Sequence, residues 1–387
     1  MRGALAALAV VLAVWAAAGV MAARADPARD YAAARAALKP HFDEAGFLDD
    51  KPETAALAQH VWRAAEAVAA NAGAGPAQAE AALAALDKDL AAHVVALDGH
   101  ALLVSLALND IGEVFIVKDG AVAWRIGEAQ AFRPPTLWPL RAWKYPAPEA
   151  GCAMAMDDDW AECNFVSPSE LGPLPPAASG ARRFWVNAVY AQRAGDTQPG
   201  QVSFWSWDGA RATPLQVGVY FFALDIGAPP SVSGDVLSLA VKEDFRSMLA
   251  CGACAGRQRL WRFAATPSAV RDLGKTSLVP ELDLIDAIYD RAAHHRSLTG
   301  LASPAAARVI AKVVAEGDPH SQWPMGALDG WVLAKYHRQI CVATDSGGAV
   351  AFWLARSGSR VTVTSARRLQ AGLCDSAVSW PGATRGS

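Results

Sequence analysis

The pattern of apolar and polar positions divides the chain into helical and strand-like stretches. In residues 26–97 apolar side chains recur every three to four positions, which is typical of amphipathic helices. Residues 50–53 have the form of a capping box at the start of one helix. A second helix is expected over residues 77–96, with Leu90 and Val94 on its apolar face. The pattern therefore predicts a helical hairpin in this part of the chain.

From residue 100 onward the period of the pattern changes to that of strands. Asp119-Gly120 stands between two β-rich runs, which is a strong hairpin signal, and Asp208-Gly209 supplies another turn. Further strands are expected at residues 183–190, 201–207 and 217–224. Strands at this spacing predict an antiparallel β-rich region, either sandwich-like or a meander.

The stretch from Val236 to Phe263 is predicted to form two strands joined through Cys251-Gly-Ala-Cys254. Helical periodicity returns after Pro280, in residues 281–295 and 303–316. Four short strands are then expected at residues 331–336, 339–344, 349–354 and 360–365. Helices followed by a four-stranded antiparallel meander make a compact α+β unit, so the predicted fold class is α+β.

These patterns predict four segments. They are a signal peptide at 1–25, a helical segment at 26–97, an antiparallel β-rich domain at 98–278 and an α+β domain at 279–387. The boundary between the last two is placed near residues 275–280, where the strand pattern gives way to the helical one.

The first 25 residues have the parts of a secretory signal peptide. Arg2 precedes an apolar run over residues 4–22, and the small residues Ala23 and Ala25 stand before Asp26. Cleavage is expected after Ala25, which predicts an exported protein, periplasmic or extracellular. An uncleaved N-terminal anchor is the alternative, because the run is nearly long enough to cross a bilayer. No later apolar run reaches that length, so no membrane span is expected after cleavage.

Composition limits the class of partner more than it identifies one. The chain is 53% hydrophobic and 19% charged, which is too apolar for a disordered protein. Its net charge is −3 and its basic runs are no longer than a doublet, which argues against a nucleic-acid partner. The partner itself is not predicted.

The chain has six cysteines, and in an exported protein an even number favours disulfide bonds over free thiols. Pairing between neighbours is favoured, because each such pair lies inside one predicted region: Cys152 with Cys163, Cys251 with Cys254, and Cys341 with Cys374. The Cys251-x-x-Cys254 spacing also matches redox-active dithiols and, less well, half of a zinc site. The strand-like surroundings favour a structural hairpin disulfide.

Signatures of catalysis are weak. The sequence contains no Gly-x-Ser-x-Gly elbow and no His-Glu-x-x-His motif, and no catalytic residue, metal ligand or cofactor is predicted. One helical stretch carries Asp283, Asp286, Asp290 and His294 on one side, which could form a metal or acid/base site. The alternative is the solvated face of an amphipathic helix, and this alternative is favoured.

Tryptophan is abundant, with 14 in the chain. Trp138, Trp143, Trp205 and Trp207 are candidate lining residues of a ligand-binding groove, because aromatic faces stack on sugars and peptides. Trp205 and Trp207 share one face of a strand whose other face is also apolar. Packing in the core is therefore the favoured alternative for that pair.

The leading functional prediction is an exported, disulfide-stapled, noncatalytic protein that acts in binding or as envelope-associated structure. One alternative is an exported hydrolase with dispersed active-site residues, for which His100, His320 and His337 are the candidate imidazoles. A second alternative is a thiol-disulfide redox protein that uses Cys251 and Cys254.

Overall fold

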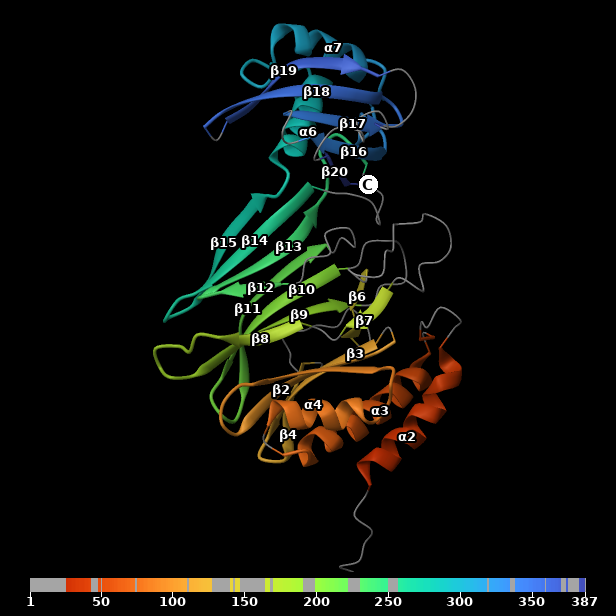
Figure 1. Cartoon of the computed structure of the whole chain (residues 1–387), viewed down its shortest axis with the longest axis vertical. Helices are drawn as coiled ribbons and strands as arrows, with labels where there is room; N and C mark the ends of the chain where they lie inside the picture. The colour runs from red at the N-terminus through yellow and green to blue at the C-terminus, as the bar shows by residue number, and fades with distance from the viewer. Residues whose placement is uncertain are drawn as a thin grey trace, which may run out of the picture. The chain divides into compact units, whose positions relative to one another are not determined.

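A computed structural model describes residues 26–42, 48–49, 51–73, 75–109, 111–126, 140–141, 143–146, 164–167, 170–190, 199–221, 230–249, 257–318, 320–334, 338–358, 360–369, 374 and 383–386. The chain divides into two compact units, residues 1–139 and 140–387. The fold is α+β, as predicted, with helices near the start of the chain and a helix-covered sheet toward its end (Figure 1).

The first unit begins with helices α2 (Pro27–Leu38), α3 (Pro52–Asn71) and α4 (Pro76–Ala84), with a short 3-10 turn at Lys39–His41. Asp26 caps α2, because its side chain accepts hydrogen bonds from the amides of Ala28 and Arg29. Helix α3 starts where the capping box predicted, with Pro52 in its first turn. Its N-cap residue, however, is Lys51, whose side chain makes no capping hydrogen bond.

The prediction of a helix over residues 77–96 is wrong in its second half. Helix α4 ends at Ala84, and β1 (Leu90–Ala96) pairs antiparallel with β2 (Ala101–Leu108). The amide of Leu90 bonds to the carbonyl of Asp87 in the turn between them. Strand β2 is buried along its whole length, so pairing with it satisfies backbone groups and buries apolar surface that an isolated helical turn could not.

The sheet of the first unit continues from β2 to β3 (Ile111–Lys118) and then to β4 (Ala121–Arg125). Asp119 and Gly120 connect β3 and β4 with φ values of 50° and 77°, so the predicted hairpin is confirmed. The helices and the sheet share one core, which includes Val61, Trp62, Val104 and Phe115.

The central part of the second unit is an antiparallel sheet. Its strands follow the order β5 (Leu140–Arg141), β9 (Arg182–Tyr190), β10 (Pro199–Trp207), β11 (Ala212–Phe221), β13 (Val236–Glu243), β14 (Arg257–Ala265) and β15 (Val270–Ser277). Two strands pair beside this path, β8 (Glu170–Leu174) with β9 and β12 (Ser231–Ser233) with β13. A separate pair joins β6 (Trp143–Pro146) to β7 (Asn164–Ser167). The two strands predicted within residues 236–263 are therefore present as β13 and β14.

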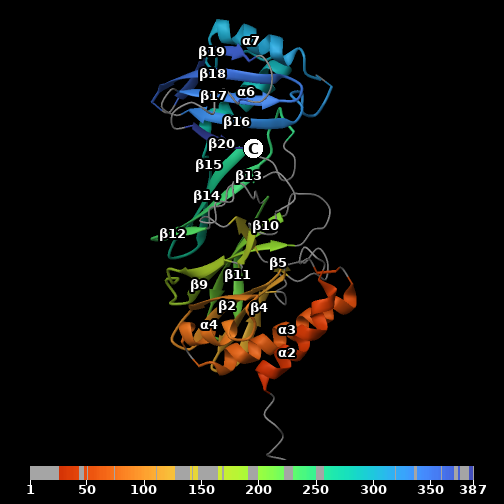
Figure 2. The ribbon, with the colours of Figure 1, turned by 45° about the vertical axis from the view of Figure 1, so that its right-hand side comes forward.

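The end of the second unit contains helices α6 (Pro280–Ala293) and α7 (Pro304–Val314) and a five-stranded sheet. The strand order is β19 (Arg360–Arg368), β18 (Gly348–Ser357), β17 (Gln339–Thr344), β16 (Leu328–Ala334) and β20 (Ala383–Gly386). Both helices pack against one face of this sheet (Figures 1 and 2). The predicted helices and four strands are confirmed, and β20 is a fifth strand that the sequence did not indicate.

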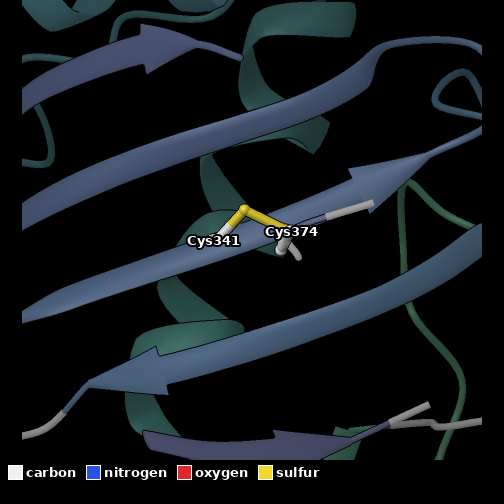
Figure 3. The surroundings of a disulfide bond; sticks show 2 residues. All are labelled: Cys341 and Cys374. Carbon is white, nitrogen blue, oxygen red and sulfur yellow. A yellow bond between two sulfur atoms is a disulfide. The ribbon is translucent and has the colours of Figure 1, made fainter. Parts of the chain in front are cut away.

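A disulfide joins Cys341 on β17 to Cys374, which confirms one of the three predicted pairings. It lies on the face of the sheet opposite α6 (Figure 3). Among the described residues, the helices are too short or too polar to cross a membrane. The chain passes from β15 to α6 between Ser277 and Pro280, the place predicted for a domain boundary, although the predicted segment limits stay predictions.

Candidate functional site

Among the described residues of the second unit, the most deeply buried carboxylate is that of Asp286 on α6, with 1% of the residue exposed. It accepts hydrogen bonds from the amides of Arg246 and Ser247, at 3.0 and 3.1 Å. The hydroxyl of Ser247 donates a third bond to the same oxygen at 2.8 Å. One carboxylate oxygen therefore holds the short segment that follows β13.

That segment is part of the C-terminal core. Phe245 and Met248 are buried in the same cluster as the apolar residues of α6, α7 and their sheet. The amide of Leu249 bonds to the carbonyl of Gly326 at 2.7 Å, and the amide of Leu328 bonds back to the carbonyl of Leu249 at 3.0 Å. Two backbone hydrogen bonds, to Gly326 and from Leu328, therefore hold Leu249 at the end of this segment.

A row of charged side chains extends from Asp286 along the ends of β13, β14 and β15. Arg257 lies with its Nε 3.8 Å from Asp286 Oδ2. Arg259 pairs with both Asp283 on α6 and Glu243 on β13. The row ends at Lys275, whose ammonium lies 3.1 Å from Glu243 and 4.7 Å above the ring of Trp261. The charges alternate in sign, so each one has an opposite neighbour.

Burial and hydrogen bonding act in opposite directions on these carboxylates. Desolvation raises the pKa of Asp286, and the hydrogen bonds from Ser247 and Arg246 only partly counter it. For Glu243 burial also opposes ionisation, but hydrogen bonds from Lys275 and Arg259 prevail and lower the pKa. The site therefore contains one carboxyl group that holds a proton more readily than usual and one that holds it less readily.

This geometry favours a structural role for the Ser247–Asp286 pair. A serine nucleophile needs a base beside it and access to a substrate. Ser247 donates its proton to a carboxylate that is already engaged by two amides, and the residue is 0% exposed. The sequence contained one usable signal for this segment: apolar Phe245 and Met248 lie within five residues of the end of a strand, which indicates that the segment is buried.

The predicted solvated face of α6 needs correction. Asp283 and Asp290 are partly exposed, but Asp286 is buried beneath the Arg246–Ser247 segment. Asp283 binds Arg259, whereas Asp290 lies 3.3 Å from His294. These side chains therefore have separate partners and do not converge on one point.

Two of the four tryptophans proposed to line a groove have described side chains, and both are buried. Trp205 is 0% and Trp207 1% exposed. The indole N–H of Trp205 donates to Ser203 Oγ at 2.8 Å, and its ring stacks on Phe184 at a centroid distance of 6.3 Å. This burial is what the core-packing alternative predicts. Trp138 and the side chain of Trp143 lie outside the described part of the chain.

The remaining candidate residues are dispersed. His100 is exposed, with Asp119 at 3.5 Å, and His320 is also exposed. His337 lies outside the described residues, as do the four cysteines whose pairing and redox role stay predictions: Cys152, Cys163, Cys251 and Cys254.

The first unit contains a polar cluster that the sequence did not reveal. Asp49 accepts hydrogen bonds from Thr54 and from the ammonium of Lys51, and it lies 3.3 Å from Nδ1 of His41. Burial works against ionisation of Asp49, but these hydrogen bonds outweigh it and lower the pKa. The amide of Asp49 also donates a hydrogen bond to the carbonyl of His41. The cluster therefore joins the end of the α2 segment to the start of α3.

Within the described residues, His, Cys, Asp and Glu side chains form no group of three or more that could hold a metal ion. Comparison with known proteins found no matching family model, no similar curated protein and no similar solved structure. The functional argument therefore depends on the residues of this chain alone.

Proposed function

We propose that this protein is exported and noncatalytic, and that it acts in binding or as envelope-associated structure. The observation that carries the noncatalytic part of the proposal is the structural role of the Asp286 carboxylate. This buried carboxylate is occupied by two amides and a hydroxyl of a core segment, which it holds in place. A group committed in this way serves the fold.

Export is tested by expressing the full chain in a bacterial host and sequencing the N-terminus of the product. A mature protein starting at Asp26 is expected, because Ala23 and Ala25 provide the small residues before the cleavage point. An Ala25→Asp variant should stay uncleaved and serves as the matched control. A wild-type protein that keeps residues 1–25 would indicate the anchored alternative.

The noncatalytic part is tested against the hydrolase alternative with a fluorophosphonate probe, which labels activated serines covalently. No labelling is expected, and Ser247 in particular is 0% exposed and cannot reach the probe. Labelling that persists in a Ser247→Ala variant would identify a dispersed nucleophile elsewhere and overturn the proposal.

Trp138 and Trp143 remain the candidate ligand-binding residues of this proposal. Acrylamide should quench part of the tryptophan fluorescence, and replacing Trp138 and Trp143 with Phe should remove the accessible fraction. The matched control replaces Trp205 and Trp207, which are buried and should leave that fraction unchanged. Equal losses in the two double variants would remove the support for a groove at Trp138 and Trp143.

A further inference from the structure

The two faces of the C-terminal sheet are covered differently. Phe352 on β18 belongs to the core beneath α6 and α7, whereas Cys341 on β17 forms its disulfide on the opposite face, called here the disulfide face (Figure 3). Residues directly opposite each other in an antiparallel ladder share a face, and so do residues two positions apart in a strand. Ala351 lies opposite Cys341, so Ala351 and Trp353 both lie on the disulfide face.

Polar side chains flank Trp353 on this face. Trp353 lies opposite Gln339 of β17 on one side and opposite Ser365 of β19 on the other. Arg367 follows two positions after Ser365 and lies opposite Ala351. Diagonal neighbours on one face of a sheet are about 7–8 Å apart, which long side chains can span. An indole, an amide, a hydroxyl and a guanidinium are therefore gathered on three adjacent strands.

This group of side chains is open to solvent. Trp353 and Gln339 are partly exposed, and Ser365 and Arg367 are exposed. Ala351, which stands between the strands of Cys341 and Arg367, is only 2% exposed. The disulfide face is therefore closed near the disulfide and accessible around Trp353.

Arg367 differs from the other three arginines of β18 and β19. Arg356 and Arg368 form ion pairs with glutamates on the helix side of the sheet, and Arg360 donates to a backbone carbonyl. In the described part of the chain, no carboxylate or carbonyl binds the guanidinium of Arg367. The cation on the disulfide face is therefore available to an external anion.

The backbone around Trp353 limits the kind of ligand that fits. Strand β18 pairs with β17 on one side and with β19 on the other, so an extended peptide cannot add to it as a further strand. A saccharide ring needs instead a flat aromatic surface with hydrogen-bonding side chains beside it. A carboxylate on such a ring matches the two-point geometry of an arginine. The chemistry of the face thus favours a sugar acid over a peptide.

We propose that the disulfide face of this sheet binds an acidic saccharide. A sugar ring stacks on the indole of Trp353, and its hydroxyls form hydrogen bonds with Gln339 and Ser365. The carboxylate of the sugar binds the guanidinium of Arg367. This site deepens the binding part of the proposed function and rests on it, because it names a class of ligand.

The first test titrates the full chain with oligomers of galacturonate, mannuronate and glucuronate by isothermal calorimetry. At least one oligomer is expected to bind, and its methyl ester, which keeps the rings but not the charge, should bind about tenfold more weakly. Failure of all three oligomers to bind at millimolar concentration would refute the site. Equally tight binding of oligoglutamate would assign the face to an acidic peptide and would also overturn the proposal.

The second test assigns the binding to Arg367. Arg367→Ala should weaken binding of the acidic oligomer about tenfold and leave binding of the methyl ester unchanged, because the ester offers no carboxylate. Arg368→Ala is the matched control, since Arg368 lies opposite Val350 of the helix-side core and pairs with Glu316. Equal losses in the two variants would remove the site but leave a binding function elsewhere in the chain intact.

The third test concerns the stacking surface. Trp353→Ala should weaken binding of the acidic oligomer and of its methyl ester alike, by about tenfold, because stacking does not depend on the charge. Trp353→Phe keeps a smaller ring and should lose less, which separates stacking from a general loss of the fold. Unchanged affinity in Trp353→Ala, or equal losses with Ala and Phe, would contradict the assignment.

Discussion

Two buried carboxylates, one in each unit, are held in different ways. Glu66 on α3 is 2% exposed and is bound by the side chains of two arginines. Arg125 from β4 contacts both of its oxygens, at 2.7 and 2.8 Å, and Arg63 binds at 2.7 Å. Asp286 is 1% exposed but is held mainly by backbone amides and a serine hydroxyl.

The difference shows how the nature of the partner sets the role of a buried charge. Arginine brings a full opposite charge and two-point geometry, so Glu66 fixes the position of α3 on β4 by an ion pair. Amides bring only partial charges, and the guanidinium of Arg257 lies farther off, at 3.8 Å, so Asp286 orders a segment of backbone with weaker charge compensation than Glu66 has. Burial raises the pKa of Asp286, so the way this segment is held depends on the protonation state of that carboxyl group.

The largest effect is expected for Glu66→Ala. Removing this carboxylate leaves the guanidinium of Arg125 without its buried partner, which should reduce the stability of the first unit by about 3–5 kcal/mol. Arg63→Ala is the control, because Arg63 is 44% exposed and should cost less than about 1 kcal/mol. Hydrogen exchange of α3 and β4 measures both. Similar losses in the two variants would contradict the ion-pair account.

Asp286→Ala should have the next largest effect. It leaves two amides and the hydroxyl of Ser247 without their acceptor, at an expected cost of about 2–3 kcal/mol. The loss should appear in the hydrogen exchange of residues 245–249 and of α6. Asp290→Ala provides a control on the same helix, since that side chain is 17% exposed and its ion pair with His294 lies within one helical turn. If the amides of residues 245–249 stay protected from exchange in Asp286→Ala, the apolar contacts of Phe245 and Met248 are enough to hold the segment.

A smaller effect is expected for Ser247→Ala. Asp286 keeps both amide donors in this variant, so only the hydroxyl hydrogen bond is lost. The expected cost is about 1 kcal/mol, measured on the same segment. A cost equal to that of Asp286→Ala would show that the hydroxyl, rather than the amides, carries the interaction.

The pH dependence should be the smallest and most specific effect. Burial raises the pKa of Asp286 above its ordinary value, so the folded state binds this proton more readily than the unfolded state. The resulting stability is fully present below the ordinary aspartate pKa and is lost as pH rises through the raised one. Relative to Asp286→Asn, the wild type should therefore become more stable as pH falls from neutral toward about 4. A difference between the two proteins that does not change with pH would show that Asp286 does not titrate in this way.

Most of the fold could be predicted where local signals were strong. The Asp119-Gly120 hairpin formed as expected, because the turn type depends on residues that are adjacent in the chain. Helices α6 and α7 followed their apolar periodicity, and the Cys341–Cys374 pair followed from its neighbourhood in the predicted layout. The helix predicted for residues 90–96 was wrong, because the apolar spacing there suits a helix and a strand alike.

The candidate site could be predicted only in part. Periodicity correctly placed Asp283, Asp286 and Asp290 on one side of a helix, but it could not show which of them is covered. Ser247 lies 39 positions away from Asp286 in the chain, and no short-range pattern connects them. The same limit applies to β20, which joins β16 from a distant part of the sequence.

The sequence by itself determined the elements whose cause is local: turn residues that fix a hairpin, and prolines and apolar stripes that define helices. The tertiary structure alone decided that residues 90–96 are a strand, that Asp286 is buried, and that β20 pairs with β16. Each of those outcomes depends on a partner brought from elsewhere in the chain. Burial and strand pairing are properties of two surfaces in contact, whereas periodicity describes only one of them.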